Sequence, residues 1–456
     1  MQSKRPTYFK RPHVTRRGFF EAGAGLAGSF LFLPESLRGA AEKQTAKVTP
    51  LAKADNVIFI LLTGAISHVD TFDFKRLNGV TPSAFGGAKI NGIDWPTGLL
   101  PKMADRFNDF AIVRSMRAWA LVHSISQTWT QIGRNPAGAL GDVAPNIGSI
   151  VALEKEVSRR PDQVFPTFVA LNASGGVGQG YFPALYAPFR LNTSAPSLPG
   201  MANTVSAGGQ ARFNAAYERM RQFDGSLRGG NIGDFRDYDE FYESAKKLTY
   251  NPTVTRAFSY TQAESAEYGG TVFGNACIVA RKVLEADQGT RFVQINAGQF
   301  DMHDNIYGDL DPDADNLQVL GKMIDVGFAK LLVDLKATGM LDRTLIVMGS
   351  EFGRVPGPLN GNKGRDHFMQ HSVVFAGAGI KGGRTIGSTD AAGAETVDPG
   401  WSRQRDIRPE DVEATILSAT GIDWTTVRTD DPLGRGFEYV PESANDVYGP
   451  INELWG

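Results

Sequence analysis

Four apolar runs in this chain are followed by histidine, usually together with carboxylate or hydroxyl side chains. The polar groups are residues 68–73 after the run 57–62, residues 123–124 after 110–113, residues 301–305 after 292–295, and residues 366–371 after 346–348. In an open parallel sheet, ligands bind at the carboxyl ends of the strands. The pattern therefore predicts a mainly parallel sheet whose carboxyl edge gathers a metal or hydrolytic site.

Strand and helix patterns alternate along most of the chain, which indicates an α/β fold. Continuous apolar runs predict buried strands, and longer amphipathic or capped segments predict helices. We expect a doubly wound, mainly parallel sheet flanked by helices. The expected strands are 56–63, 110–113, 167–171, 292–295, 344–348 and 372–376, and the expected helices are 124–132, 146–156, 237–247, 271–285, 317–336 and one that begins at Pro409.

The N-terminus has the features of a targeting segment. A basic leader precedes the twin arginine Arg16-Arg17, Phe19 follows, and residues 22–33 form a mildly apolar stretch rich in glycine and alanine. This combination is typical of a Tat signal, here residues 1–41, rather than of an ordinary basic amphipathic start. It predicts export by the Tat translocase to the periplasm or cell envelope, with no transmembrane segment beyond the signal.

Composition divides the rest of the chain into three segments. We expect a linker at 42–55, an α/β domain at 56–440 and a C-terminal tail at 441–456. Residues 172–231 are rich in Gly, Pro, Ser and Asn, which predicts a loop-rich insertion or lid within that domain. The glycine run 175–180 is followed by Tyr-Phe-Pro, which would break a helix, so it does not match a dinucleotide-binding turn.

Composition excludes some classes of function. The net charge is −2 and there is no basic stripe, so nucleic-acid binding is not expected. The single cysteine, Cys277, cannot form an intrachain disulfide and lies in an apolar helical run, which favours a buried structural thiol.

Asp301 and His303 are the strongest metal-ligand candidates by spacing. Two residues apart on an extended segment, they can point to the same side and share an ion. A hydrogen-bonded structural pair is the alternative. Asn305 follows as a supporting residue. Glu351, after the next strand, could bind metal or act as a base.

Basic and histidine side chains near residue 365 suggest anion and metal binding. Arg354 could grip a phosphate or sulfate oxygen, although an internal salt bridge with Glu351 explains it equally well. Arg365 is a second anion-binding candidate. Asp366 and His367 could be a ligand and its orienting partner. If the segment is helical, His371 shares a face with His367.

Hydroxyl groups and histidines near two other strands offer catalytic roles. His68 and Asp70, with Asp73 close by, follow the first strand. His123 and Ser124 stand where a helix begins, and a hydroxyl there can be activated as a nucleophile. Turn formation and helix capping are the structural alternatives.

Taken together, these motifs resemble a Tat-exported bacterial family, a domain of unknown function related to the sulfatases of the alkaline phosphatase superfamily. The resemblance runs from Asn56 to Asp423. It is carried by residues 57–73, 268–282, 298–303, 350–354, 365–367 and 377–383. It implies an alkaline-phosphatase-like fold and the hydrolysis of phosphate or sulfate esters with one or two divalent ions, such as Zn, Ca, Mg or Mn.

The resemblance also implies roles for single residues. Asp301 and His303 correspond to a first pair of metal ligands, Glu351 to a metal-binding aspartate and His367 to a late metal-binding histidine. His123-Ser124 falls near the nucleophile position.

The chain departs from the superfamily pattern in three places. No aspartate directly follows the first strand, so Asp70 would have to serve from farther along. Phe352 replaces a residue that is often His or Asn. The nucleophile motif of sulfatases is not clearly present.

We therefore expect a metal-dependent hydrolase of a small anionic ester or an envelope polymer. Ser124 is the nucleophile candidate, with His123 or His68 as acid/base. The ligands or close partners are Asp301, His303, Glu351, His367 and Asp70. The alternative is a non-catalytic envelope protein on the same fold that binds a metal, a polysaccharide or a protein partner.

Overall fold

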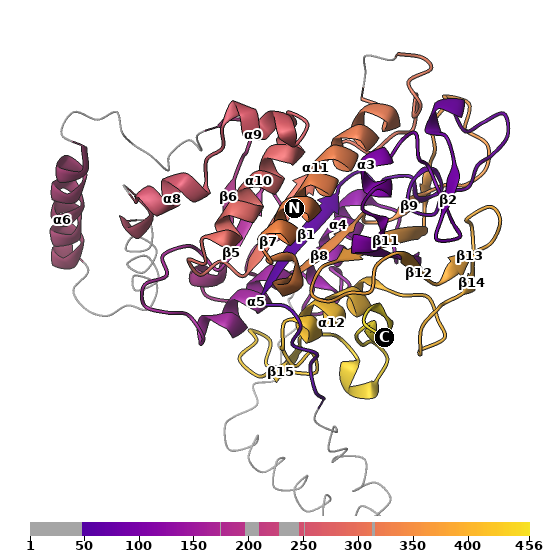
Figure 1. Cartoon of the computed structure of the whole chain (residues 1–456). Coiled ribbons are helices and arrows are strands. Elements are labelled where there is room, and N and C mark those ends of the chain that lie inside the picture. Colours follow the sequence, from indigo (N-terminus) through magenta and orange to yellow (C-terminus); the bar gives the residue numbers. More distant parts are fainter. Residues whose placement is uncertain (1–47, 174, 197–208, 228–245, 250, 312–314) are drawn as a thin grey trace, which may run out of the picture. The chain divides into compact units, whose positions relative to one another are not determined.

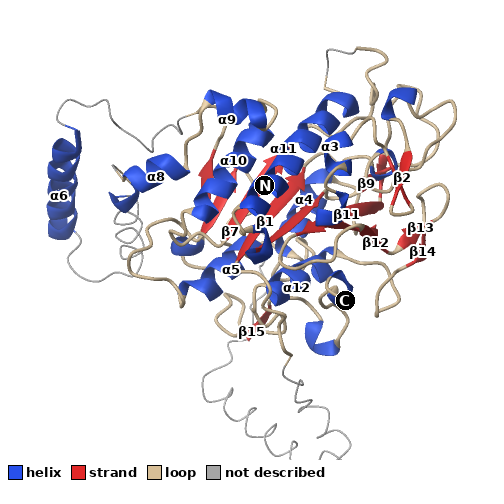
Figure 2. Ribbon diagram, in the orientation of Figure 1, coloured by secondary structure: helices blue, strands red, loops and turns tan. Residues whose placement is uncertain are grey.

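An eight-stranded sheet forms the centre of the fold, in the order β12-β4-β11-β8-β1-β7-β5-β6 (Figure 2). The computed structural model describes residues 48–173, 175–196, 209–227, 246–249, 251–311 and 315–456. The strands are β1 (Asn56–Leu62), β4 (Phe110–Arg117), β5 (Phe168–Leu171), β6 (Phe189–Leu191), β7 (Phe292–Ala297), β8 (Thr344–Gly349), β11 (Gln370–Ala376) and β12 (Arg384–Ile386).

The sheet is parallel except for one strand. β1 pairs in parallel with β7 and β8, and β5 pairs in parallel with β6 and β7. β11 runs antiparallel between β4 and β8. The expectation of a mainly parallel α/β sheet is confirmed.

Helices cover both faces of the sheet (Figure 1). The described helices are α3 (Pro101–Ala104), α4 (His123–Ile132), α5 (Ile147–Glu156), α6 (Gly209–Leu227), α8 (Pro252–Ala257), α9 (Gln262–Glu267), α10 (Val272–Glu285), α11 (Leu317–Ala337) and α12 (Pro409–Ala419). Alternate residues of β1 point to opposite faces. Ile58 and Ile60 pack with α10 and α11, whereas Val57 and Phe59 pack with α5 and α12. The doubly wound arrangement follows from this two-sided burial.

Local sequence explains where several helices begin. The side chain of Asn316 accepts hydrogen bonds from Gln318 N and Val319 N at the start of α11. Asn146 caps α5 and Thr271 caps α10 in the same way. α12 begins with Pro409, followed by two acidic residues in its first turn.

Among the described residues, four two-stranded sheets lie outside the central one. They are β2 (Ala88–Ile90) with β3 (Ile93–Trp95), β9 (Gly353–Arg354) with β10 (His367–Phe368), β13 (Ser388–Thr389) with β14 (Thr396–Asp398), and β15 (Val427–Arg428) with β16 (Phe437–Glu438). His367 therefore belongs to β10 and His371 to β11, so the two histidines do not share a helical face. The glycine-containing segment between Arg354 and His367 forms a hairpin instead.

Residues on both sides of the expected 56–440 domain belong to one compact unit, Thr49–Gly456. Residues 52–54, expected in a linker, donate backbone hydrogen bonds to the carbonyls of Ser418 and Ala419 at the end of α12. Ile451 and Leu454, expected in a tail, are fully buried in the core. Both segments are thus part of the fold, because each contributes backbone pairing or apolar side chains.

Other expectations fall partly or wholly outside the described residues. The Tat signal at 1–41 lies outside them, as does most of the helix expected at 237–247. Part of the insertion 172–231 is described, and it contains β6, which extends the central sheet. None of the helices in the described ranges combines the length and the apolar character that a membrane span requires.

Candidate metal centre

The carboxyl ends of β1, β7 and β8 meet at one edge of the sheet because these neighbouring strands run parallel. Asp301 lies shortly after β7 and Glu351 shortly after β8. His123 is the first residue of α4, which follows β4. The β9–β10 hairpin pairs Arg354 with His367 and so places this histidine at the same edge.

Three histidine Nε2 atoms and one carboxylate oxygen converge between these elements. Nε2 of His367 lies 3.0 Å from Nε2 of His123 and 2.8 Å from Nε2 of His303. Oδ1 of Asp301 lies 3.1 Å from Nε2 of both His123 and His303, and 3.4 Å from Nε2 of His367. We refer to these four residues as the four-ligand cluster.

The other ring nitrogen of each histidine has its own acceptor. Nδ1 of His123 lies 2.7 Å from Oε1 of Glu351, and Nδ1 of His303 lies 2.8 Å from Oδ1 of Asp366. Nδ1 of His367 lies 2.8 Å from the carbonyl oxygen of Leu121. A carbonyl only accepts, so Nδ1 of His367 carries the proton. Metal-binding histidines show this pattern of a carboxylate or carbonyl behind the ring.

In the neutral rings, donation from Nδ1 leaves Nε2 without a proton, and these nitrogens then present lone pairs to one another and to a carboxylate oxygen. Such a group repels itself unless a cation lies between its members. A tetrahedral zinc ion with bonds of 2.0–2.1 Å places its ligand atoms about 3.3 Å apart. The separations of 2.8–3.4 Å in the four-ligand cluster match that spacing. The residues present therefore fit a divalent metal ion.

Arg354 supports the cluster from the protein side. Its side chain is fully buried, and the NH2 group donates to Oδ1 of Asp301 at 2.6 Å. The guanidinium also donates to the carbonyl oxygens of Gly64, Ala65 and Arg365. The Arg354 side chain is consequently fixed and does not face an incoming anion.

Charges around the cluster shift its pKa values. Burial would raise the pKa of Asp301, but the hydrogen bond and charge of Arg354, together with His123, lower it to about 2. The hydrogen bond to Glu351 raises the pKa of His123. Burial lowers the pKa of His367. Asp301 is therefore a carboxylate, and His367 is neutral at neutral pH, as metal ligands must be.

A cavity of about 1150 Å³ opens beside the cluster, and His123 and Asp301 line it. The side chains of Asp301 and His303 are 46% and 44% exposed, so a small molecule can approach the cluster. Most other polar lining residues are neutral, among them Thr63 and Gln127. The remaining charged ones are Asp315 and, on α11, Lys322.

Gln127 is a site residue that the sequence reasoning missed. It lies one turn after His123 on α4, and its Nε2 atom donates to Oε1 of Glu351 at 2.8 Å. Gly64 N donates to the same oxygen at 2.9 Å. Glu351 thus lies behind His123, as an orienting partner, rather than in the four-ligand cluster. Gln127 could have been predicted from its i, i+4 spacing to His123, which places both side chains on one face of the helix.

Asp70 and Arg365 form a buried ion pair away from the cluster. Arg365 Nε donates to Oδ2 of Asp70 at 2.9 Å, and the Tyr307 hydroxyl donates to Oδ1 at 2.8 Å. Both charged side chains are almost completely buried. Neither lines the cavity, so the structure brings Asp70 to no metal position and Arg365 to no exposed anion position.

Three further predicted site residues are buried in the protein and do not line the cavity. Nε2 of His68 contacts the carbonyl oxygen of Gly393 at 2.8 Å. Asp73 lies 3.3 Å from Arg114 Nε and 3.2 Å from Lys75 Nζ. His371 is buried in β11, and burial lowers its pKa to about 3. These residues stabilise or occupy the core rather than the cavity.

Ser124 and Asn305 are also separate from the cluster. Ser124 is exposed on α4, and its backbone carbonyl accepts from Thr128. It does not line the cavity beside His123. Asn305 accepts from the backbone of Leu310 and donates to the carbonyl of Asp311, which fixes its loop. Cys277 is fully buried in α10.

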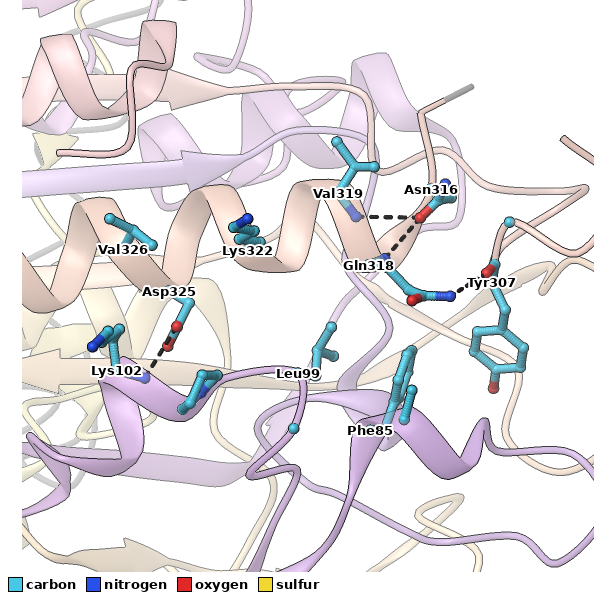
Figure 3. Close-up of a pocket in the computed structure, with 14 residues that line it drawn as sticks. Phe85, Leu99, Lys102, Tyr307, Asn316, Gln318, Val319, Lys322, Asp325 and Val326 are labelled. Carbon is cyan, nitrogen blue, oxygen red and sulfur yellow. Dashed lines mark hydrogen bonds between the residues drawn. The ribbon is translucent and has the colours of Figure 1, made fainter. Parts of the chain in front are cut away.

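A second cavity, of about 560 Å³, lies along α11 (Figure 3). Phe85 and Leu99 supply apolar lining, and Asp325 accepts from the amides of Lys102 and Met103. None of the four cluster residues lines this cavity. Lys322 lines both cavities.

A family model described as "Protein of unknown function (DUF1501)" matches residues 54–447. No curated protein matches the sequence of this chain.

Several solved structures resemble the chain at low identity. The lipoteichoic acid synthase LtaP from Listeria monocytogenes is 12% identical, with 87% of this chain and 78% of that chain covered and a TM-score of 0.38. The PsFucS1 sulfatase from Pseudoalteromonas sp. is 15% identical, with 82% and 68% covered and a TM-score of 0.39. The phosphonate monoester hydrolase SpPMH from Silicibacter pomeroyi is 13% identical, with 88% and 77% covered and a TM-score of 0.40.

Proposed function

This chain belongs to the family described as "Protein of unknown function (DUF1501)", and we propose that it is a metal-dependent hydrolase of a phosphate or sulfate ester. Its main support is the convergence of three imidazole nitrogens and one carboxylate oxygen beside a large cavity that His123 and Asp301 line. A structural metal site is usually enclosed, whereas a catalytic site keeps access for substrate.

The donor set favours zinc among the divalent ions. Imidazole nitrogen suits zinc, whereas calcium and magnesium prefer oxygen ligands. His123, His303, His367 and Asp301 would hold the ion. When bound, it would supply Lewis acidity to an ester oxygen.

The chain's own residues would orient the metal ligands and attract the substrate. Glu351 and Asp366 fix the rings of His123 and His303, and Arg354 fixes Asp301. Lys322 is the cationic side chain of the cavity lining and would attract the anionic group of the ester. Ser124 is assigned no role because it does not line the cavity.

A non-catalytic metal-binding protein is the second candidate. Four protein ligands converge on one point, which could complete a tetrahedral ion, and the predicted nucleophile Ser124 does not line the cavity. These two observations favour metal binding without catalysis. Such a protein would act in the cell envelope, with a polysaccharide or protein partner.

The proposed location is the periplasm or cell envelope. Its basis is the sequence of residues 1–41, which has the features of a Tat signal. The substrate would then be a small anionic ester or an ester group of an envelope polymer.

Hydrolysis of chromogenic esters by zinc-loaded and metal-free protein tests the proposal. Suitable substrates are 4-nitrophenyl phosphate, bis(4-nitrophenyl) phosphate and 4-nitrophenyl sulfate. Turnover of any of them should require the metal, should fall at least about 100-fold in Asp301→Ala and His367→Ala, and should persist in Ser124→Ala. Absence of turnover in fully loaded, folded protein would favour the binding role.

A further inference from the structure

Arg354 is a buried cation in direct contact with the four-ligand cluster. Its NH2 group lies 2.6 Å from Oδ1 of Asp301, and its NH1 group lies 3.4 Å from Nε2 of His303. We propose that the chain binds a single divalent cation and that the Arg354 guanidinium supplies the second, permanent positive charge of the site. This inference rests on the proposed function and specifies how its site is charged.

The position of Arg354 is built into the fold. It is held by the carbonyl oxygens of Gly64, Ala65, Phe300 and Arg365. These carbonyls belong to the loops that follow β1 and β7 and to the β9–β10 hairpin. The guanidinium therefore cannot move aside without leaving several buried carbonyls without a donor. A second ion that shared Asp301 would compete with this fixed cation.

The nearby carboxylates are already engaged. Oε1 of Glu351 accepts from Gly64 N, His123 and Gln127, and Asp366 accepts from His303. Within the described ranges, the four-ligand cluster is the one group of three or more histidine, cysteine or acidic side chains whose ligand atoms converge. Oε2 of Glu351 is buried without a partner, but one oxygen does not make an ion site.

Metal titration of the metal-free protein tests this inference. Cobalt(II) binding, followed by its visible absorption, should saturate at one ion per chain, and mass spectrometric metal analysis should give one zinc per chain. Two ions per chain would overturn the single-ion inference while leaving the metal-dependent function intact. No bound ion in folded protein would overturn both.

Two variants of Arg354 separate its charge from its positioning of Asp301. Arg354→Met removes the positive charge, so the first ion should bind at least about ten-fold more tightly. Arg354→Lys keeps the charge and should bind the ion with nearly unchanged affinity. Weaker binding by Arg354→Met would show that the residue only positions Asp301 and would overturn its role as the second charge. If Arg354→Met does not fold, the cobalt stoichiometry of the unmodified chain still decides the number of ions, and a large change of affinity in Arg354→Lys would contradict the role of the charge.

Discussion

Each histidine of the four-ligand cluster depends on the group behind its ring. Glu351 is fully buried and accepts three hydrogen bonds on Oε1, whereas Asp366 is exposed. Solvent can replace the Asp366 contact more easily than the Glu351 contact. The two carboxylates should therefore contribute unequally to metal binding.

Replacing the carboxylates tests this difference. Glu351→Gln should weaken zinc binding by about 10–100-fold, and Asp366→Asn should weaken it less, because loss of an orienting partner has effects of that order. Competition with a chromophoric chelator measures both dissociation constants. Asp304→Asn, an exposed neighbour outside the cluster, is the control and should leave zinc affinity unchanged. Equal affinity of all three variants would contradict the orienting roles.

His371 should make the fold sensitive to acid. Burial lowers its pKa to about 3 in the folded protein, whereas its ordinary value is near 6.5. Between these values the unfolded chain binds the extra proton, so the stabilisation present above pH 6.5 is lost as the pH falls toward 3.

The expected loss of unfolding free energy from His371 between pH 7 and pH 5 is about 2 kcal/mol. Urea unfolding at the two pH values measures it. His371→Gln cannot take up this proton and should lose correspondingly less stability over the same interval. The same pH dependence in both proteins would exclude His371 as the source.

Among the connections between strands, the turn after β1 determines how closely β1 and the loop after β7 approach each other. Gly64 has φ +93°, and a Cβ at this position would lie 2.6 Å from Asp301 N and 2.8 Å from Phe300 N. Any side chain here would push the Asp301 loop away from the sheet. Asp301, a proposed metal ligand, is thus positioned by a glycine in the turn after a different strand.

Gly64→Ala should consequently cost both stability and metal affinity. We expect a loss of about 2–4 kcal/mol, because backbone strain and a backbone clash combine. Gly79→Ala is the matched control, since Gly79 also has positive φ (+78°) but nothing lies within 4 Å of its Cβ position. Thermal unfolding and chelator competition check both variants. Similar behaviour of the two would contradict the proposed close approach.

The sequence was informative about strands and less so about their connections. Continuous apolar runs marked β1, β7 and β8, because both faces of these strands are covered. Nothing in the run 370–376 distinguishes an antiparallel strand from a parallel one, so the direction of β11 was not predictable. The hairpin that carries His367 was also missed, since its register depends on Arg354 pairing across it.

Strand ends predicted the edge of the sheet but not which side chains face the cavity. At that edge the structure does bring together four predicted residues, namely His123, Asp301, His303 and His367. His68, Asp70 and Asp73 follow β1, and His371 lies four residues after His367, yet all four side chains are buried and do not line the cavity. Their orientation depends on tertiary partners such as Arg365 and Arg114, which are distant in sequence.

For the whole molecule, the C-terminal segment completes one side of the core. Ile451 is fully buried, and its amide donates to Oγ1 of Thr415 on α12. Trp455 Nε1 donates to the carbonyl of Ala378. The last residues therefore stabilise the sheet-covering layer that contains α12.

Ile451→Ala should lower the free energy of unfolding by about 2–5 kcal/mol, the usual cost of emptying a buried isoleucine site. Chemical denaturation measures this change. Val447→Ala, at a position that is 42% exposed, should have little effect. A small effect of Ile451→Ala would show that the segment is only loosely attached to the core.

Anomalous diffraction from zinc-loaded crystals is the most direct test of the metal centre. We expect one anomalous peak per chain, within bonding distance of Nε2 of His123, His303 and His367 and on the Asp301 side of the cluster. A zinc-loaded crystal with no anomalous peak at this cluster, or with its ion bound elsewhere, would show that these four residues do not form the metal centre.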